Sequence, residues 1–145
     1  LDETSEGLLL LTTNGKLSAY VSSQKIEKEY YVQVDGVITE QAIETLRFGV
    51  VISIHGNLYK TKECRVKLLN NLGTFPFEKR FVRADRHGPT SWISITLTEG
   101  KFRQIRKMTA TVNFPTLRLV RVRIGSIKLT LTAGQVLQVN EFVLE

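Results

Sequence analysis

The sequence predicts an α+β fold, with a mixed, mainly antiparallel β-sheet flanked by helices. Short runs rich in β-branched and aromatic residues are bounded by turn residues, as strands are. Two other stretches space their apolar residues as amphipathic helices do. With 145 residues and 42% hydrophobic content, the chain can bury one ordinary core. We therefore expect residues 1–145 to form a single domain with its helices on one side of the sheet.

The start of the chain places an acidic residue and a short turn ahead of an apolar run. Residues 8–11 are four consecutive leucines preceded by Gly7, too few to span a membrane, which predicts a strand buried on both faces. A carboxylate just before such a strand would be held on a rigid scaffold, so Asp2 is the leading candidate for a functional residue. The alternative is that Asp2 and Thr4 only stabilise a turn.

The first half of the chain also contains a well-marked helix. Thr39 can accept a hydrogen bond from a free amide of the first turn, and Gly49 can end the helix after Arg47. Its inner face is expected to carry Ala42, Ile43 and Leu46. The other elements expected here are a short helix at 16–22 and strands at 29–37, 50–54 and 64–69.

The second half contains one strand with clear alternation. Ile93, Ile95 and Leu97 face one side of the run 91–98, and polar residues face the other, which is typical of a half-buried strand. The other elements expected here are a polar loop at 75–90, a helix at 103–112 and short strands at about 116–124, 126–131 and 136–143.

Positive charge is concentrated near the end of the chain. The formal net charge is +6, yet residues 1–100 are neutral, with 12 basic and 12 acidic side chains. Between residues 101 and 140 lie eight basic residues and no acidic one: Lys101, Arg103, Arg106, Lys107, Arg118, Arg121, Arg123 and Lys128. A field of one sign indicates a polyanionic partner, and arginine suits bidentate contacts with phosphates or base edges. The alternative is a generally basic, soluble surface.

Several functional classes find no support in the sequence. The lone Cys64 has no partner for an internal disulfide, which fits a reducing compartment, and it is expected to be a small core residue. His55 and His87 have no second ligand at metal-binding spacing, so no metal site is predicted. Neither a signal-peptide pattern nor an apolar run of about 18 residues is present, so we expect a cytoplasmic protein without membrane contact.

Three segments, in order along the chain, resemble the motifs of one family. Residues 1–12 (LDETSEGLLLLT) resemble the aspartate-bearing motif of bacterial ribosomal RNA pseudouridine synthases of the RsuA branch. Residues 28–36 (KEYYVQVDG) are similar to the family's Lys-x-Tyr strand. Residues 99–108 (EGKFRQIRKM), continuing into 114–119 (FPTLRL), are similar to its third motif. The resemblance covers nearly the whole chain and is greatest to members that act on the large ribosomal subunit.

The resemblance implies an isomerase that converts a specific uridine of 23S ribosomal RNA to pseudouridine. The N1–C1′ bond breaks, the base turns and a C5–C1′ bond forms, so no cofactor or metal is implied. Asp2 matches the family's catalytic aspartate, which acts at the reacting nucleotide. Tyr30 matches the tyrosine that stacks on the flipped-out base and assists in removing the C5 proton. Arg106 matches the basic residue that pairs with Asp2 and keeps it ionised.

Further residues are expected to bind the RNA. Leu117 is implied as an apolar contact under the base, and the expected phosphate contacts are Lys28, Lys101, Arg103, Lys107, Arg118, Arg121 and Arg123. Because Arg121 and Arg123 are two positions apart on a strand, they are expected to share a face. As alternatives, either Tyr30 or Tyr31 could pack in the core, and the basic residues of 103–107 could form a solvated helix face.

The family pattern also sets expectations for the whole protein. Family members carry a strand and a helix ahead of this point, so we expect an N-terminally incomplete catalytic domain. They also often have an aspartate where Thr4 stands. We expect it to be a monomer. Two alternatives remain open: a noncatalytic RNA- or ribosome-binding domain of the same fold, and a synthase that acts on 16S ribosomal RNA or transfer RNA.

Overall fold

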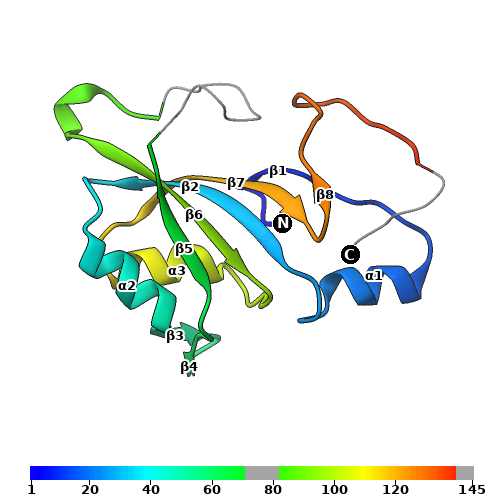
Figure 1. The fold of residues 1–145 in the computed structure, drawn as a ribbon, viewed down its shortest axis with the longest axis horizontal. Coiled ribbons are helices and arrows are strands. Elements are labelled where there is room, and N and C mark those ends of the chain that lie inside the picture. Colours follow the sequence, from blue (N-terminus) through cyan, green and yellow to red (C-terminus); the bar gives the residue numbers. More distant parts are fainter. Residues whose placement is uncertain (71–81, 140–145) are drawn as a thin grey trace.

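A large β-sheet forms the centre of the molecule in this computed structural model, which describes residues 1–70 and 82–139. Its strands, in chain order, are β1 (Glu6–Gly7), β2 (Lys28–Asp35), β5 (Arg65–Leu69), β6 (Thr90–Leu97), β7 (Thr116–Ile124) and β8 (Ile127–Lys128). In space the order is β1-β7-β2-β6-β5, and β8 also pairs with β7 (Figure 1). β1 lies parallel to β7 and the other pairs are antiparallel, which confirms the expected mixed, mainly antiparallel sheet.

Three helices and a hairpin complete the described structure. They are α1 (Gly15–Ser22), α2 (Glu40–Phe48), α3 (Gln104–Thr111) and the hairpin of β3 (Val51–Ile54) with β4 (Asn57–Lys60), besides a short 3-10 turn at Asp85–His87. α2 and α3 lie on one face of the sheet, whereas α1 lies apart from them, near the start of β2 (Figure 1). No helix of residues 1–70 and 82–139 has the length and apolar character needed to cross a bilayer.

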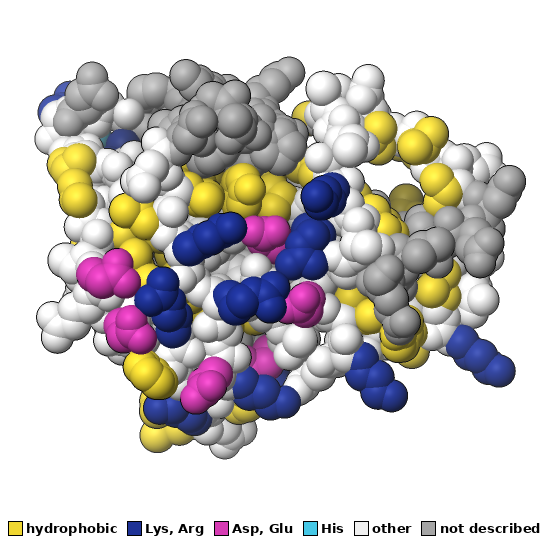
Figure 2. Space-filling view, in the orientation of Figure 1, with side chains coloured by type: hydrophobic (Ala, Val, Ile, Leu, Met, Phe, Trp, Pro, Cys, Tyr) yellow, Lys and Arg dark blue, Asp and Glu magenta, His cyan; other side chains and the backbone are white. Residues whose placement is uncertain are grey.

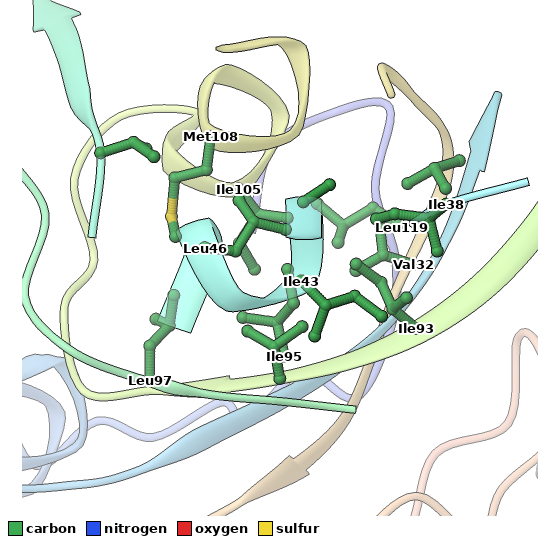
Figure 3. Packing of buried hydrophobic residues seen from close by; sticks show 14 of the residues in the cluster. Val32, Ile38, Ile43, Leu46, Ile93, Ile95, Leu97, Ile105, Met108 and Leu119 are labelled. Carbon is green, nitrogen blue, oxygen red and sulfur yellow. The ribbon is translucent and has the colours of Figure 1, made fainter. Parts of the chain in front are cut away.

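The main core fills the space between the sheet and the two helices α2 and α3. Ile43 and Leu46 of α2, Met108 of α3, and Ile93 and Ile95 of β6 all belong to this cluster (Figure 3), and each of these residues is at most 1% exposed. Burying one such side chain contributes about 1.5–3 kcal/mol to stability. The core therefore gives β2 and β7, which pass over it, a rigid support.

The helix α2 forms as its end signals predict. The Thr39 side chain accepts a hydrogen bond from the Ala42 amide at 3.1 Å. Gly49 ends the helix with a φ of +100°, and a Cβ there would lie 2.2 Å from the Thr61 carbonyl oxygen, so only glycine fits. The expected inner face of Ala42, Ile43 and Leu46 is confirmed, since all three are buried.

The leucine run 8–11 does not form the expected strand. Only Glu6–Gly7 pairs with β7, and the chain leaves the sheet after the Leu8 amide donates to the Arg121 carbonyl at 2.8 Å. Leu8 and Leu10 pack against a small cluster around Ile26 and Ile124, beside α1. Leu9 and Leu11 are 58% and 75% exposed. Among the described residues, the cluster around Ile26 and Ile124 covers one side of this segment, and the alternate leucines face away from it.

The strand β6 is more buried than the half-buried strand that was expected. Both of its faces are buried, and Ser94 and Thr96 are only 2% and 6% exposed. β6 lies between β2 and β5, and side chains from neighbouring strands cover its polar face. Ser94 donates to the Glu29 carboxylate at 2.6 Å, which satisfies the buried hydroxyl.

The remaining expectations for single elements have mixed outcomes. The helices at 16–22 and 103–112 and the strands at 29–37, 50–54, 64–69 and 116–124 are confirmed within a few residues. The strand β4 was not expected, and 126–131 forms only the two-residue β8. No strand forms at 136–139, and 140–143 lies outside the described residues. Of the loop expected at 75–90, residues 75–81 also lie outside them, and Thr90 already belongs to β6.

Candidate active site

A pocket of about 720 Å³ opens beside the start of the chain. Its walls come from the first residues, α1, β2, the turn before α3, and β7. Six of the residues singled out in the sequence line it: Asp2, Lys28, Tyr30, Lys101, Arg103 and Arg121. Segments that are far apart in the sequence therefore bring a carboxylate, a phenol and four cations to one cavity.

Asp2 is held by the turn that follows it. Its Oδ1 atom accepts hydrogen bonds from the Thr4 amide at 3.2 Å, the Thr4 hydroxyl at 3.1 Å and the Ser5 hydroxyl at 2.9 Å. The Ser5 amide also donates to the Asp2 carbonyl at 3.0 Å. This is the local turn of the alternative interpretation, but it also fixes the carboxylate at the pocket wall, so the two interpretations are compatible.

The second oxygen of the same carboxylate faces two arginines from the start of α3. The Oδ2 atom of Asp2 lies 3.6 Å from Arg103 Nη1 and 3.7 Å from Arg106 Nε. Arg106 Nη2 donates to the Thr4 carbonyl at 3.2 Å and to Ser5 Oγ at 3.3 Å. The Arg106 Nε atom is buried and has no hydrogen-bond partner among the described residues. The expected approach of Arg106 to Asp2 is thus present as a charge pair.

The surroundings of Asp2 favour its ionised form. Partial burial raises the pKa of the carboxyl, but the hydrogen bonds from Ser5 and Thr4 and the charges of Arg106 and Arg103 outweigh that effect. The net result is a pKa below the ordinary aspartate value of 3.8. The pocket therefore presents a carboxylate near neutral pH, able to act as a nucleophile or to accept a proton.

Tyr30 stands on β2, with Arg121 of β7 directly across the strand pair. It lines the pocket and also packs against the main core, so its position is compatible with both the functional interpretation and the core-packing alternative. Tyr31, the next residue, faces the other side of the sheet. There burial and the nearby Glu29 raise the pKa of its phenol.

Lys28 is a buried cation in the lining of the pocket. Only 6% of this residue is exposed, and its ammonium donates a hydrogen bond to the Ser23 carbonyl at 2.9 Å. Burial and the charge of Arg121 lower the pKa of this lysine. Arg121 itself donates through Nε to the Leu8 carbonyl at 2.9 Å, which ties the pocket wall to the first segment.

Arg121 and Arg123 lie on opposite faces of the sheet, and the expectation of a shared face is wrong. Arg121 pairs with Tyr30 and Arg123 pairs with Glu29, so β7 advances two residues where β2 advances one. Val122 is the extra residue of this β-bulge, which breaks the alternation of side chains. Arg123 therefore forms its ion pair with Glu29, at 3.2 Å, away from the pocket.

The face that carries Arg123 has mixed charge. Figure 2 shows Lys and Arg side chains interspersed with Asp and Glu over the strands of the large sheet. The pairs Arg123–Glu29 and Arg65–Glu27, the latter at 2.7 Å, have this character. A smaller cavity of about 490 Å³ lies between them. Such pairing reduces the attraction of this face for a polyanion.

The other expected contact residues lie outside the lining of the large pocket. Arg118 is 7% exposed and forms a two-bond ion pair with Glu6, with Nε 2.7 Å and Nη2 2.8 Å from the carboxylate oxygens. Lys107 donates to the Ser53 carbonyl at 2.8 Å. Leu117 is half-buried at a second register shift, between Gln33 and Val34 of β2.

Several pocket residues were not anticipated from the sequence, among them Ser5, Leu119 and Phe102. Ser5 provides the shortest hydrogen bond to Asp2, and its place three residues after an aspartate is the only local signal for it. Leu119, rather than Leu117, lines the pocket from β7. Phe102 also lines it, and no pattern distinguished this ring from a core residue. Among the described residues, no group of three or more His, Cys, Asp or Glu side chains could hold a metal ion.

Comparison with known proteins gives a consistent set of similarities. A family model described as RNA pseudouridylate synthase matches residues 1–111. The chain is 42% identical over 131 residues to "Ribosomal large subunit pseudouridine synthase E" of Vibrio parahaemolyticus, covering 89% of this chain and 53% of that protein. It is 39% identical over 131 residues to the protein of the same name from Xanthomonas axonopodis, covering 89% of this chain and 67% of that protein.

A solved structure agrees with the sequence similarities. The fold matches a structure described as "Crystal structure of pseudouridylate synthase" with a TM-score of 0.68 and 25% identity, covering 89% of this chain and 48% of the other. The chain thus spans about half the length of that structure and of the Vibrio relative. The matched segment includes Asp2, Tyr30 and Arg106, which the family resemblance had singled out. The chain belongs to the RNA pseudouridylate synthase family.

Proposed function

We propose that the protein containing this chain converts a uridine of large-subunit ribosomal RNA to pseudouridine, with Asp2 as the catalytic carboxylate. The observation that carries the proposal is the position of Asp2. Asp2 presents a carboxylate with a lowered pKa, which accepts hydrogen bonds from two hydroxyls and lies beside two arginines. The cavity that it lines also contains a tyrosine and further cations. The names of the relatives support the large ribosomal subunit as the target.

The pocket residues suit the separate needs of the reaction. The target base must leave the helix stack to reach a carboxylate in a cavity, and the ring of Tyr30 offers it a surface at the pocket wall. Asp2 would act at C1′ of the sugar or on a proton of the nucleotide while the base turns. Arg103 and Arg106 keep it ionised, and Arg103, more exposed at 38% of its side chain, would also contact a phosphate.

The cations expected to bind RNA divide into two groups. Lys101, Arg103 and Arg121 line the cavity and are proposed as phosphate contacts, together with the buried Lys28, which also lines it. Arg118 and Arg123 are engaged with Glu6 and Glu29, so RNA would have to displace a carboxylate to reach them. We therefore place the main RNA surface at the mouth of the large pocket. A ribosomal RNA substrate would be met in the bacterial cytoplasm.

Mass-spectrometric mapping of pseudouridine tests this proposal. In cells that lack the gene, one or more pseudouridines of 23S ribosomal RNA should be absent, and the wild-type gene should restore them. The gene carrying Asp2→Asn should not restore them, although its product should fold and still bind RNA. Loss of a modification from 16S ribosomal RNA or transfer RNA instead would change the substrate. An unchanged map, or rescue by the Asp2→Asn variant, would favour a noncatalytic RNA-binding domain.

A further inference from the structure

An aromatic and basic cluster stands at the rim of the large pocket. Phe102, in the turn before α3, is 55% exposed although it is a large apolar side chain. Its ring stacks with that of His55, with 5.6 Å between ring centroids and 22° between ring planes. His55 lies between β3 and β4 and has a φ of +48°. The tip of the hairpin and the turn 99–103 therefore meet through two exposed rings.

Two lysines lie over aromatic rings in this region. The Lys107 ammonium lies 5.3 Å from the centroid of the Phe102 ring, and the Lys101 ammonium lies 5.1 Å from that of Tyr59. Lys107 is held in this place because it also donates to the Ser53 carbonyl. Aromatic faces interleaved with lysines are the surface by which proteins bind single-stranded RNA, since bases stack on the rings and phosphates meet the cations.

The cluster is continuous with the proposed active site. Phe102 and Lys101 line the same cavity as Asp2 and Tyr30. The residue after Phe102 is Arg103, whose guanidinium lies 3.6 Å from the Asp2 carboxylate. A base stacked on Phe102 would thus lie in the same cavity as a nucleotide bound at Asp2, where a nucleotide that flanks the target could reach it.

The turn that carries Phe102 is fixed before any ligand binds. The buried Glu99 carboxylate accepts from the Lys62 amide and from Gln104 Nε2, each at 3.0 Å, and from the Tyr59 hydroxyl. The Gln104 amide donates to the Lys101 carbonyl at 3.1 Å. A ring presented on such a turn loses little conformational freedom when a base stacks on it, which favours binding.

We propose that Phe102, with His55 beside it, is a stacking site for an unpaired RNA base that flanks the modified uridine. This inference rests on the proposed function for the identity of the RNA, but the stacking itself does not require turnover. It assigns the hairpin β3–β4 to substrate binding and predicts that the target uridine lies in a segment with at least one unpaired neighbour.

Binding measurements with matched RNAs test the site. The probe is a synthetic single-stranded RNA of mixed sequence, and its duplex with the complementary strand is the control. In the protein containing residues 1–145, Phe102→Ala should weaken single-strand binding roughly 5-fold to 150-fold, the equivalent of losing one stacked base at about 1–3 kcal/mol. Duplex binding should change less than about twofold, because a paired base offers no free face.

Two further variants make the result specific. Phe102→Tyr should bind like the wild type, because the aromatic face is kept. Phe48→Ala is the matched control: Phe48 is 63% exposed at the end of α2 and does not line the pocket, so its loss should have no effect. Equal binding of the single strand by Phe102→Ala and wild type would overturn the proposal. So would an equal loss of single-strand and duplex binding.

A spectroscopic readout separates this proposal from the proposed function. Trp92 is the chain's single tryptophan and is 8% exposed, so Phe102→Trp adds an exposed indole to a buried one. Single-stranded RNA should quench the added fluorescence, and the duplex should not. The quenching should persist when Asp2→Asn is added. Quenching without any pseudouridine product would retain the stacking site and reject the synthase activity, whereas equal fluorescence with and without single-stranded RNA would reject the stacking site.

Discussion

At the scale of single residues, the two carboxylate oxygens of Asp2 have different partners. Oδ1 accepts neutral hydrogen bonds from Thr4 and Ser5, and Oδ2 faces the guanidinium groups of Arg103 and Arg106. Where the family often has an aspartate, Thr4 donates to the carboxylate through its amide and its hydroxyl. An aspartate side chain at that position would add a like charge and remove the hydroxyl donor.

Ser5→Ala should raise the pKa of Asp2. The Ser5 hydroxyl donates to the ionised carboxylate at 2.9 Å, so its loss makes ionisation less favourable. A lowered pKa in the folded state adds stability at pH values above the unfolded value, and this stability is lost as the pH falls through the folded value. Because the pKa of Asp2 is higher in the variant, its carboxylate should be protonated, and activity lost, at a higher pH than in the wild type. NMR titration of Asp2 and the acid limb of the kcat/KM profile measure the shift, and coincident profiles would contradict it.

At the scale of elements, β7 does most to assemble the site. It lies between β1 and β2, carries the two register shifts, and places Arg121 in the pocket but Arg123 on the other face. Its partner β1 is only two residues long, yet it fixes the turn that holds Asp2. The position of the Asp2 carboxylate, the proposed catalytic group, therefore depends on a very short strand pair.

Arg121→Gln and Arg123→Gln should have different effects on RNA binding. If Arg121 meets a phosphate, its loss should lower the slope of log K against log salt by roughly 0.7–0.9 and weaken binding. Arg123→Gln should leave the slope unchanged and lower stability, because Glu29 loses its ion-pair partner. RNA affinity across a salt series, with urea denaturation of both variants, tests this. Equal slopes for the two variants would show that the bulge does not separate their roles.

Gly7→Ala should disrupt the junction of β1 and β7. Gly7 has a φ of +106°, and an added Cβ would lie 2.2 Å from the Arg121 carbonyl oxygen, so the backbone pair would have to separate. We expect a lower Tm and a loss of activity of at least about tenfold as Asp2 moves, since small displacements of reacting groups are costly. Gly15→Ala is the control, because nothing lies within 4 Å of the added Cβ and its φ is not positive. A Gly7→Ala variant with wild-type Tm and activity would refute the dependence.

At the scale of the whole molecule, Glu99 connects parts that the sheet alone does not hold together. Only 2% of this residue is exposed, and its carboxylate joins β4, the segment after it and the start of α3. It thereby couples the hairpin that carries His55 to the turn that carries Phe102 and Arg103. These contacts together hold the rim of the pocket in place.

Glu99→Ala should destabilise the protein and impair the site together. The change leaves the Lys62 amide, Gln104 Nε2 and the Tyr59 hydroxyl without their common acceptor. We expect a loss of roughly 2–4 kcal/mol in the free energy of unfolding, since a buried donor without a partner costs about 1–3 kcal/mol. Urea denaturation measures it, with Glu63→Ala at an exposed position as the control. Similar unfolding midpoints for the two variants would be inconsistent with this role for Glu99.

The sequence by itself determined the features that depend on nearest neighbours along the chain. Thr39 and Gly49 mark the ends of α2, and the spacing of Ala42, Ile43 and Leu46 gives its buried face, because capping and helical period are local. The motifs that resemble the pseudouridine synthases likewise identified the family. Asp2 was selected through its motif, and its partners Thr4 and Ser5 lie within three residues of it.

The tertiary structure alone decided what depends on strand register and on cover from other segments. Arg121 and Arg123 separate because Val122 bulges against β2, and no period within β7 encodes which residue its partner skips. Within the described residues, Leu9 and Leu11 are exposed because they face away from the cluster that Leu8 and Leu10 contact, and Ser94 is buried where the Glu29 side chain of the neighbouring strand accepts its hydrogen bond. Burial is a property of what packs against a residue, and a chain's own pattern specifies only what it is able to bury.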